Sequence, residues 1–136
     1  MNIRIIIDSP GGDVYEVLKF IDFIAIIKSQ YPEFRYISCI HGTAFSASTL
    51  MAIVADHRQM TENASAMIHQ ISLWDGGVIN FLNQRMKHYN DLYNKLVDIY
   101  AQNSKNEHDF IIDLLTRESW FDSTKYLEMG FINQII

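Results

Sequence analysis

The sequence has little of what marks secreted, membrane-spanning or nucleic-acid-binding chains. Cys39 is the single cysteine among 136 residues, so no disulfide forms within the chain, and this favours a reducing compartment. No apolar run approaches the length of a membrane-spanning helix, and no signal-peptide pattern stands at the start. The 11 Lys and Arg residues are scattered and the net charge is −5, which argues against a nucleic-acid partner. We therefore expect a soluble, cytoplasmic domain that contacts no membrane.

Segments that bind nucleotides or join domains are also missing. The sequence has no Gly-x-x-x-x-Gly-Lys-Ser/Thr phosphate loop, so any use of ATP belongs to a separate partner. It has no internal repeat, linker or low-complexity stretch. With 136 residues, 49% of them hydrophobic, it is long enough for one folded domain with one core. We expect no cofactor and no metal.

Alternating strand and helix signals predict an α/β fold. The longest helical pattern, at residues 78–102, is about twice the mean length of globular helices, so we expect it to project or to pack on a partner subunit. Strands are expected at residues 2–8, 35–40, 57–61, 66–70 and 131–136, with a turn at 41–45, and helices at residues 13–29, 46–55, 78–102, 104–115 and 122–130.

Polar residues at the predicted helix starts have the spacing of capping motifs. Asp13 with Glu16, and Ser104 with Glu107, resemble capping boxes. Asp122 is expected to cap the last helix.

A serine at a strand-to-helix turn is the main chemical signal in the sequence. A hydroxyl becomes a nucleophile when a base takes its proton and a third group orients that base. Ser46, His69 and Glu118 could supply these three roles. Asp122 is an alternative acid, and a Ser–His pair with no third acid is a further alternative. The competing interpretations are that Ser46 only caps a helix and that His69 is a buried strand residue. His41, close to Ser46 in the sequence, is a rival base that we interpret as a strand-end residue.

A glycine turn upstream is suited to binding an oxyanion. Residues 8–12 read Asp-Ser-Pro-Gly-Gly, and the backbone N–H groups of such a turn can face a developing negative charge. Gly12 has no side chain to obstruct a substrate carbonyl. The helix that begins at Ser46 adds partial positive charge at its N-terminus.

Three motifs in order give the sequence a family resemblance: Ser-Pro-Gly-Gly at 9–12, Gly-Thr-Ala-Phe-Ser at 42–46 and Met-Ile-His-Gln at 67–70. The chain resembles the proteolytic subunit of the Clp protease from its first strand to its last residue. The resemblance implies a ClpP/crotonase-like α/β spiral of β-β-α units with a long projecting helix. It also implies that residues 1–136 form a single peptidase domain lacking the N-terminal segment of the family.

The resemblance implies a role for each candidate residue. Ser46 would be the nucleophile, His69 the general base and Glu118 the third member of a triad. The oxyanion hole would consist of the backbone N–H groups of Gly12 and Ala47.

The sequence departs from the family pattern at several of these places. Glu118 stands where the family usually has Asp, and Ile71 where it has Pro. Ala47 and Ser48 replace a common Met-Gly pair.

The function implied is a serine endopeptidase that cleaves peptides or unfolded proteins inside a homo-oligomeric ring, fed by a separate AAA+ unfoldase. The helix at 78–102 would interlock two rings, with Tyr89, Tyr93 and Tyr100 as candidate contacts, and Arg117 would join an ion pair between rings. One alternative is a non-catalytic structural subunit of a mixed ring. A crotonase-type acyl-CoA enzyme is disfavoured, because such chains are usually much longer.

Overall fold

The computed structural model describes all residues, 1–136, as a six-stranded sheet with five helices, which confirms the predicted α/β class. The strands run in the order β5-β4-β2-β3-β6, and β1 also pairs with β2. All pairings are parallel except β4 with β5. The elements are β1 Asn2–Ser9, α1 Val14–Gln30, β2 Arg35–Phe45, α2 Ala47–Ile53, β3 His57–Met60, β4 Ser65–Ile68, α3 Ile79–Ser104, α4 His108–Thr116, β5 Ser119–Asp122, α5 Ser123–Glu128 and β6 Gln134–Ile135.

The central strand β2 is longer than predicted. It does not end at Ile40 but continues to Phe45, pairing with β3 in its first half and with β4 in its second. The strand passes Gly42, whose φ is +100°. A Cβ there would lie 2.7 Å from the Asp8 carboxylate, which accepts hydrogen bonds from Thr43 N and Thr43 Oγ1 at 3.0 Å. Gly42 and Asp8 together therefore allow the strand to continue where the sequence predicts a turn.

Asp13 and Asp122 are confirmed as caps, and the cap predicted at Ser104 is wrong. Glu16 accepts from Lys19 Nζ at 3.0 Å and does not complete the capping box predicted with Asp13. The Asp13 side chain accepts from Tyr15 N at 2.7 Å at the start of α1, and Asp122 accepts from Lys125 N at 2.8 Å at the start of α5. Ser104, by contrast, is the last residue of α3, and its hydroxyl donates to Tyr100 O at 2.6 Å. The helix that it was expected to cap begins at His108.

A buried arginine on β3 joins three chain segments. Arg58 on β3 is 9% exposed, and its guanidinium donates to Ile53 O at 3.1 Å, Asn103 O at 2.8 Å and Gly130 O at 3.3 Å. These carbonyls lie at the ends of α2 and α3 and just after α5. Burial lowers the pKa of Arg58. The three carbonyls accept from its two terminal nitrogens, while the buried Nε has no hydrogen-bond partner.

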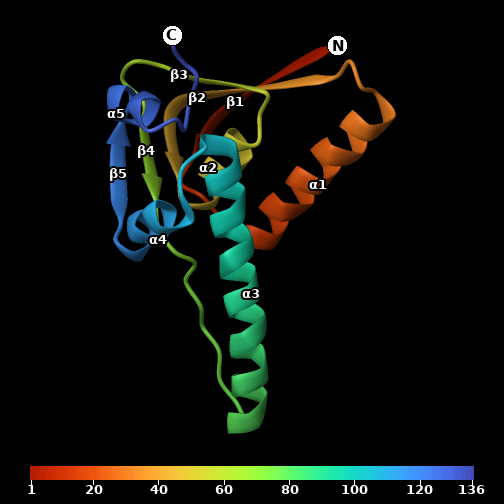
Figure 1. Cartoon of the computed structure of the whole chain (residues 1–136), viewed down its shortest axis with the longest axis vertical. Coiled ribbons are helices and arrows are strands. Elements are labelled where there is room, and N and C mark those ends of the chain that lie inside the picture. The colour runs from red at the N-terminus through yellow and green to blue at the C-terminus, as the bar shows by residue number, and fades with distance from the viewer.

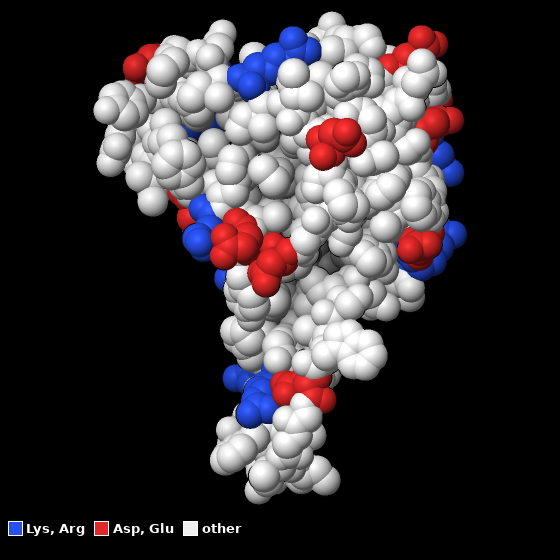
Figure 2. All heavy atoms as spheres, turned by 180° about the vertical axis from the view of Figure 1, so that it is seen from behind, with Lys and Arg blue, Asp and Glu red and all other residues white.

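The helix α3 projects from the body, and the chain between β4 and α3 runs beside it (Figure 1). The helix α3 has 26 residues, close in length and position to the long helix predicted at 78–102. Figure 2 shows that the end of the projection, beyond a band of charged side chains, is free of Lys, Arg, Asp and Glu on the face drawn. Large exposed hydrophobic residues of the projection are Leu73, Trp74, Val78, Ile79, Phe81 and Met86. No helix of the protein is both long and apolar enough to cross a membrane.

Candidate active site

Ser46 occupies a sharp turn between β2 and α2. Its φ of 57° and ψ of −127° lie outside the regions that non-glycine residues usually adopt, which is common at functional turns. Its backbone N–H donates to Met67 O on β4 at 2.7 Å, which fixes the turn against the neighbouring strand. The side chain makes no capping hydrogen bond, so the hydroxyl is free for another partner. This excludes the simple N-cap interpretation of Ser46.

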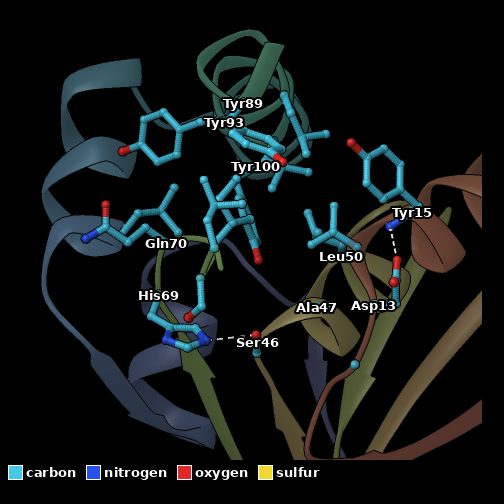
Figure 3. Close-up of a pocket in the computed structure, with 18 of the residues that line it drawn as sticks. Asp13, Tyr15, Ser46, Ala47, Leu50, His69, Gln70, Tyr89, Tyr93 and Tyr100 are labelled. Carbon is cyan, nitrogen blue, oxygen red and sulfur yellow. Dashed lines mark hydrogen bonds between the residues drawn. The ribbon is translucent and has the colours of Figure 1, made fainter. Parts of the chain in front are cut away.

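That partner is His69, the first residue after β4. His69 Nε2 lies 2.8 Å from Ser46 Oγ, and both residues are half-buried (Figure 3). The next residue is tied down, because Gln70 N donates to Leu115 O at 2.9 Å. The pairing of β2 with β4 thus brings together two residues separated by 23 positions. A histidine at this distance can take the proton of the hydroxyl.

The glycine turn lies against the backbone of the serine turn. Gly11 has a φ of +104°, and a Cβ on it would stand 2.7 Å from Phe45 O and 2.9 Å from Ser46 Cβ. A side chain there is excluded by close approach and by backbone conformation together. Around Gly12 no atom lies within 4 Å of the corresponding position. The strict requirement for glycine therefore falls on Gly11, while Gly12 leaves open space beside the cavity.

A buried serine links the two turns. Ser48, 2% exposed, lies within hydrogen-bond distance of Ser9 O at 3.1 Å and Phe45 O at 2.8 Å. Ala47 N, at the start of α2, has no acceptor within the helix, and the Gly12 N–H donates to no backbone carbonyl. Both predicted oxyanion donors are therefore available to a ligand.

Neither predicted acid is hydrogen-bonded to His69. Glu118 is exposed and accepts a hydrogen bond from Trp120 Nε1 at 3.1 Å, and no hydrogen bond joins it to His69. Asp122 is engaged in capping α5. His41 is exposed and makes no side-chain hydrogen bond, whereas the only side-chain hydrogen bond of His69 is the one to Ser46. No group of three or more His, Cys, Asp and Glu side chains is placed to hold a metal ion.

A cavity of about 480 Å³ opens above the Ser–His pair. In Figure 3 the tyrosines of α3 lie across it from Ser46 and His69. Tyr15 lines this cavity, and its Oη lies 2.8 Å from His88 Nε2, which connects the start of α1 with α3. The apolar residues along its wall include Val14, Leu50, Met67, Leu92, Leu96 and Leu115.

An aspartate fixes the loop before α3. Asp75 accepts from Tyr89 Oη and from Arg85 Nη1, each at 2.9 Å. The hydrogen bond from Tyr89 is the main reason that the pKa of Asp75 lies below its ordinary value. The loop is therefore held along the projecting helix on the side of the cavity.

Thr49 and Tyr100 lie near the nucleophile, and the sequence does not predict either of them as part of the site. Thr49 is fully buried and lies 2.6 Å from the Tyr100 hydroxyl. Tyr100 is 3% exposed, which is inconsistent with its predicted role as a contact between rings. Adjacent hydroxyl residues, Ser48 and Thr49, at the start of an otherwise apolar helix are the sequence signal that could have indicated these contacts.

A serine raised on a strand-to-helix turn, with a histidine on its hydroxyl, is the arrangement of serine-type hydrolases. The Clp protease family matches the chain over residues 1–136. The chain therefore belongs to the Clp protease family and is a serine-type peptidase.

The individual relatives are all named as the proteolytic subunit of the ATP-dependent Clp protease. The chain is 30% identical over 139 residues to the ATP-dependent Clp protease proteolytic subunit of Streptococcus suis (strain 98HAH33), an alignment that covers 99% of this chain and 68% of the relative. It is 29% identical to that of Streptococcus thermophilus (strain ATCC BAA-491 / LMD-9), with the same coverage. It is 28% identical to that of Deinococcus radiodurans over 136 residues, which cover 98% of this chain and 64% of the relative.

Proposed function

We propose that the protein is a serine endopeptidase in which Ser46 is the nucleophile and His69 the general base. The observation that carries the proposal is the 2.8 Å contact between Ser46 Oγ and His69 Nε2 at the floor of an apolar cavity. Apolar walls suit the apolar side chain of a peptide or unfolded protein. The class of substrate proposed is therefore a polypeptide with an apolar residue next to the bond that is cleaved.

In the reaction, Ser46 Oγ attacks the carbonyl carbon and His69 Nε2 takes the hydroxyl proton. The negative charge on the tetrahedral oxygen accepts hydrogen bonds from the N–H groups of Ala47 and Gly12. Each donor of this kind stabilises the transition state by roughly 3 kcal/mol. His69 then passes the proton to the leaving amine, and water releases the acyl group by the same steps in reverse order.

The reacting pair is proposed to work without a carboxylate bound to His69. A third member would have to accept a hydrogen bond from the second ring nitrogen of His69, and Glu118 instead accepts one from Trp120. Loss of the acid costs about 10⁴ in rate in a related mechanism, which leaves substantial catalysis. Glu118 becomes the third member only if its side chain turns from Trp120 towards His69.

We also propose that the chain assembles into rings fed by a separate unfoldase. Its relatives are named as subunits of an ATP-dependent protease. The projection carries exposed apolar side chains, with Trp74 98% exposed and Ile79 72% exposed, and patches of this kind mark contacts with other chains. Arg117, predicted to pair between rings, contacts Asp113 of its own chain at 2.6 Å.

The test is the intact mass of the protein after exposure to a fluorophosphonate. The wild type should gain one adduct, which Ser46→Ala and His69→Ala should lose, because the reagent needs an activated serine and an oxyanion site. Ser29→Ala, which removes an exposed hydroxyl on α1, should keep the adduct. A wild type that stays unlabelled as an assembled oligomer would contradict the proposal and favour a non-catalytic subunit.

A further inference from the structure

The peptide between Ser46 and Ala47 carries one of the proposed oxyanion donors, and its carbonyl is held from the opposite side. Ser46 O accepts from Thr49 N at 3.0 Å and from Thr49 Oγ1 at 2.7 Å. A carbonyl oxygen has two lone pairs, so these two donors fill it. Because the peptide unit is planar and trans, its C=O and N–H point in opposite directions. Holding the carbonyl therefore sets the direction of the Ala47 N–H.

The Thr49 hydroxyl is held in turn by the long helix. Thr49 Oγ1 and Tyr100 Oη lie 2.6 Å apart. A threonine hydroxyl has a single proton, which it gives to Ser46 O, so the tyrosine hydroxyl is the donor in the second hydrogen bond. Both side chains are buried, at 0% and 3% exposure. Burial also raises the pKa of Tyr100, so the phenol keeps the proton that it donates.

The serine turn needs such a restraint. Its combination of φ 57° and ψ −127° is unfavourable for a residue with a side chain. Rotation of the following peptide changes ψ and would relieve the strain by moving Ser46 towards the left-handed helical region. That rotation would also turn the Ala47 N–H away from the cavity. We infer that Thr49 and Tyr100 are positioning residues that hold the Ser46–Ala47 peptide in the orientation needed to bind the oxyanion. The inference rests on the proposed roles of Ser46 and Ala47.

The experiment compares hydroxyl deletions in cleavage of a fluorogenic peptide with an apolar residue at the scissile bond. Thr49→Val should lower kcat by about 10- to 100-fold with KM nearly unchanged, because a misdirected oxyanion donor acts on the transition state. Tyr100→Phe should lower kcat less, since Thr49 keeps its own hydrogen bond to Ser46 O. The double variant should be no slower than Thr49→Val, because Tyr100 acts only through Thr49.

Two variants and one ligand separate positioning from general stability. Thr49→Ser keeps the hydroxyl and should restore kcat to within a few-fold of the wild type. Tyr126→Phe removes a buried hydroxyl that has no hydrogen-bond partner and should leave kcat unchanged. A peptide boronate, which forms a tetrahedral adduct with the serine, should lose affinity for Thr49→Val in parallel with kcat. If Thr49 only packs in the core, Thr49→Val would lower the melting temperature without a matching loss of kcat and boronate affinity.

The outcomes distinguish this inference from the proposal on which it rests. A wild type without the fluorophosphonate adduct overturns both. A labelled wild type together with a folded Thr49→Val of unchanged kcat and boronate affinity overturns the positioning role alone. If Thr49→Val does not fold, Tyr100→Phe tests the positioning role instead. An unchanged kcat in that variant would overturn the inference.

Discussion

At the scale of single residues, the sequence motifs locate the Ser–His pair better than they locate the acid. Ser46 and His69 each lie at the end of a strand, and the strands pair directly, so position in the motif also gives position in space. Glu118 is predicted as the acid from its place in the family pattern, where Asp is usual. The side chain that faces this part of β4 depends on the register of β5, in which Ser119 pairs with Ile68. That strand is not predicted from the sequence, so spacing alone could not place the acid.

Removing either candidate acid is expected to change catalysis little. Glu118→Gln should keep kcat/KM within about twofold of the wild type, because the Glu118 carboxylate contacts Trp120 rather than His69. Asp122→Asn should also cleave normally, since Asn caps a helix as well as Asp does. The measurement is peptide cleavage by both variants at several pH values. A loss of more than about a hundredfold in Glu118→Gln would identify Glu118 as the third member of a triad.

At the scale of elements, periodicity recovers the helices and most strands. The long pattern at residues 78–102 becomes α3, because its apolar residues recur on one helical face. The failures are contacts between segments: β2 continues past Gly42 because Asp8 satisfies Thr43, and the four-residue β5 exists because it pairs with β4. Ser104 ends a helix instead of starting one. Neither strand pairing nor a carboxylate from another strand leaves a periodic pattern in the local sequence.

Asp56, just before β3, joins α1 to the sheet and should make stability depend on acid pH. It accepts from Lys28 Nζ at 2.7 Å and from Tyr36 N at 2.8 Å. Burial alone would raise the pKa of Asp56, but the hydrogen bonds from Lys28 and Tyr36 lower it below its ordinary value of 3.8. The ionised form is therefore favoured in the folded state. Its contribution is present at neutral pH and is lost as the pH falls through the folded-state pKa, below 3.8.

Asp56→Asn should accordingly lower the free energy of unfolding at pH 7 by about 1–2 kcal/mol, since an amide makes weaker hydrogen bonds to these two donors. The difference from the wild type should shrink in strongly acid solution. Denaturant unfolding followed by circular dichroism between pH 2.5 and pH 7 measures both effects. Lys19→Gln, which breaks an exposed ion pair within α1, is the control and should change little. A constant difference across this pH range would contradict the assignment.

At the scale of the whole molecule, the projection exposes an apolar surface that another chain could cover. It leaves the body as a single helix with an accompanying loop, and its end exposes apolar side chains (Figure 1). In an isolated chain this surface would stay in contact with water. Contact with a second copy would bury it and contribute roughly 25 cal/mol for each Å² of apolar area removed from water.

The wild type is therefore expected to sediment as an oligomer, and Ile79→Glu should shift it to smaller species, because a carboxylate would be buried at the contact. Gln102→Glu adds the same charge near the other end of α3 and should leave the distribution unchanged. The emission of Trp74 offers a second readout, since its indole should move to shorter wavelength on assembly. A wild type that sediments as a monomer would rule out the ring.

The buried Arg58 has a consequence for how the molecule opens. Its guanidinium donates to the end of α2, the end of α3 and the segment after α5. Its Nε already has no partner, so releasing any one of these carbonyls would leave the buried cation with still fewer acceptors, which is costly. The helix behind the nucleophile, the projecting helix and the closing segment should therefore behave as one cooperative unit. Amide protons in α2 would then exchange with solvent only through events that disrupt all three, and the serine turn would share the stability of the whole fold.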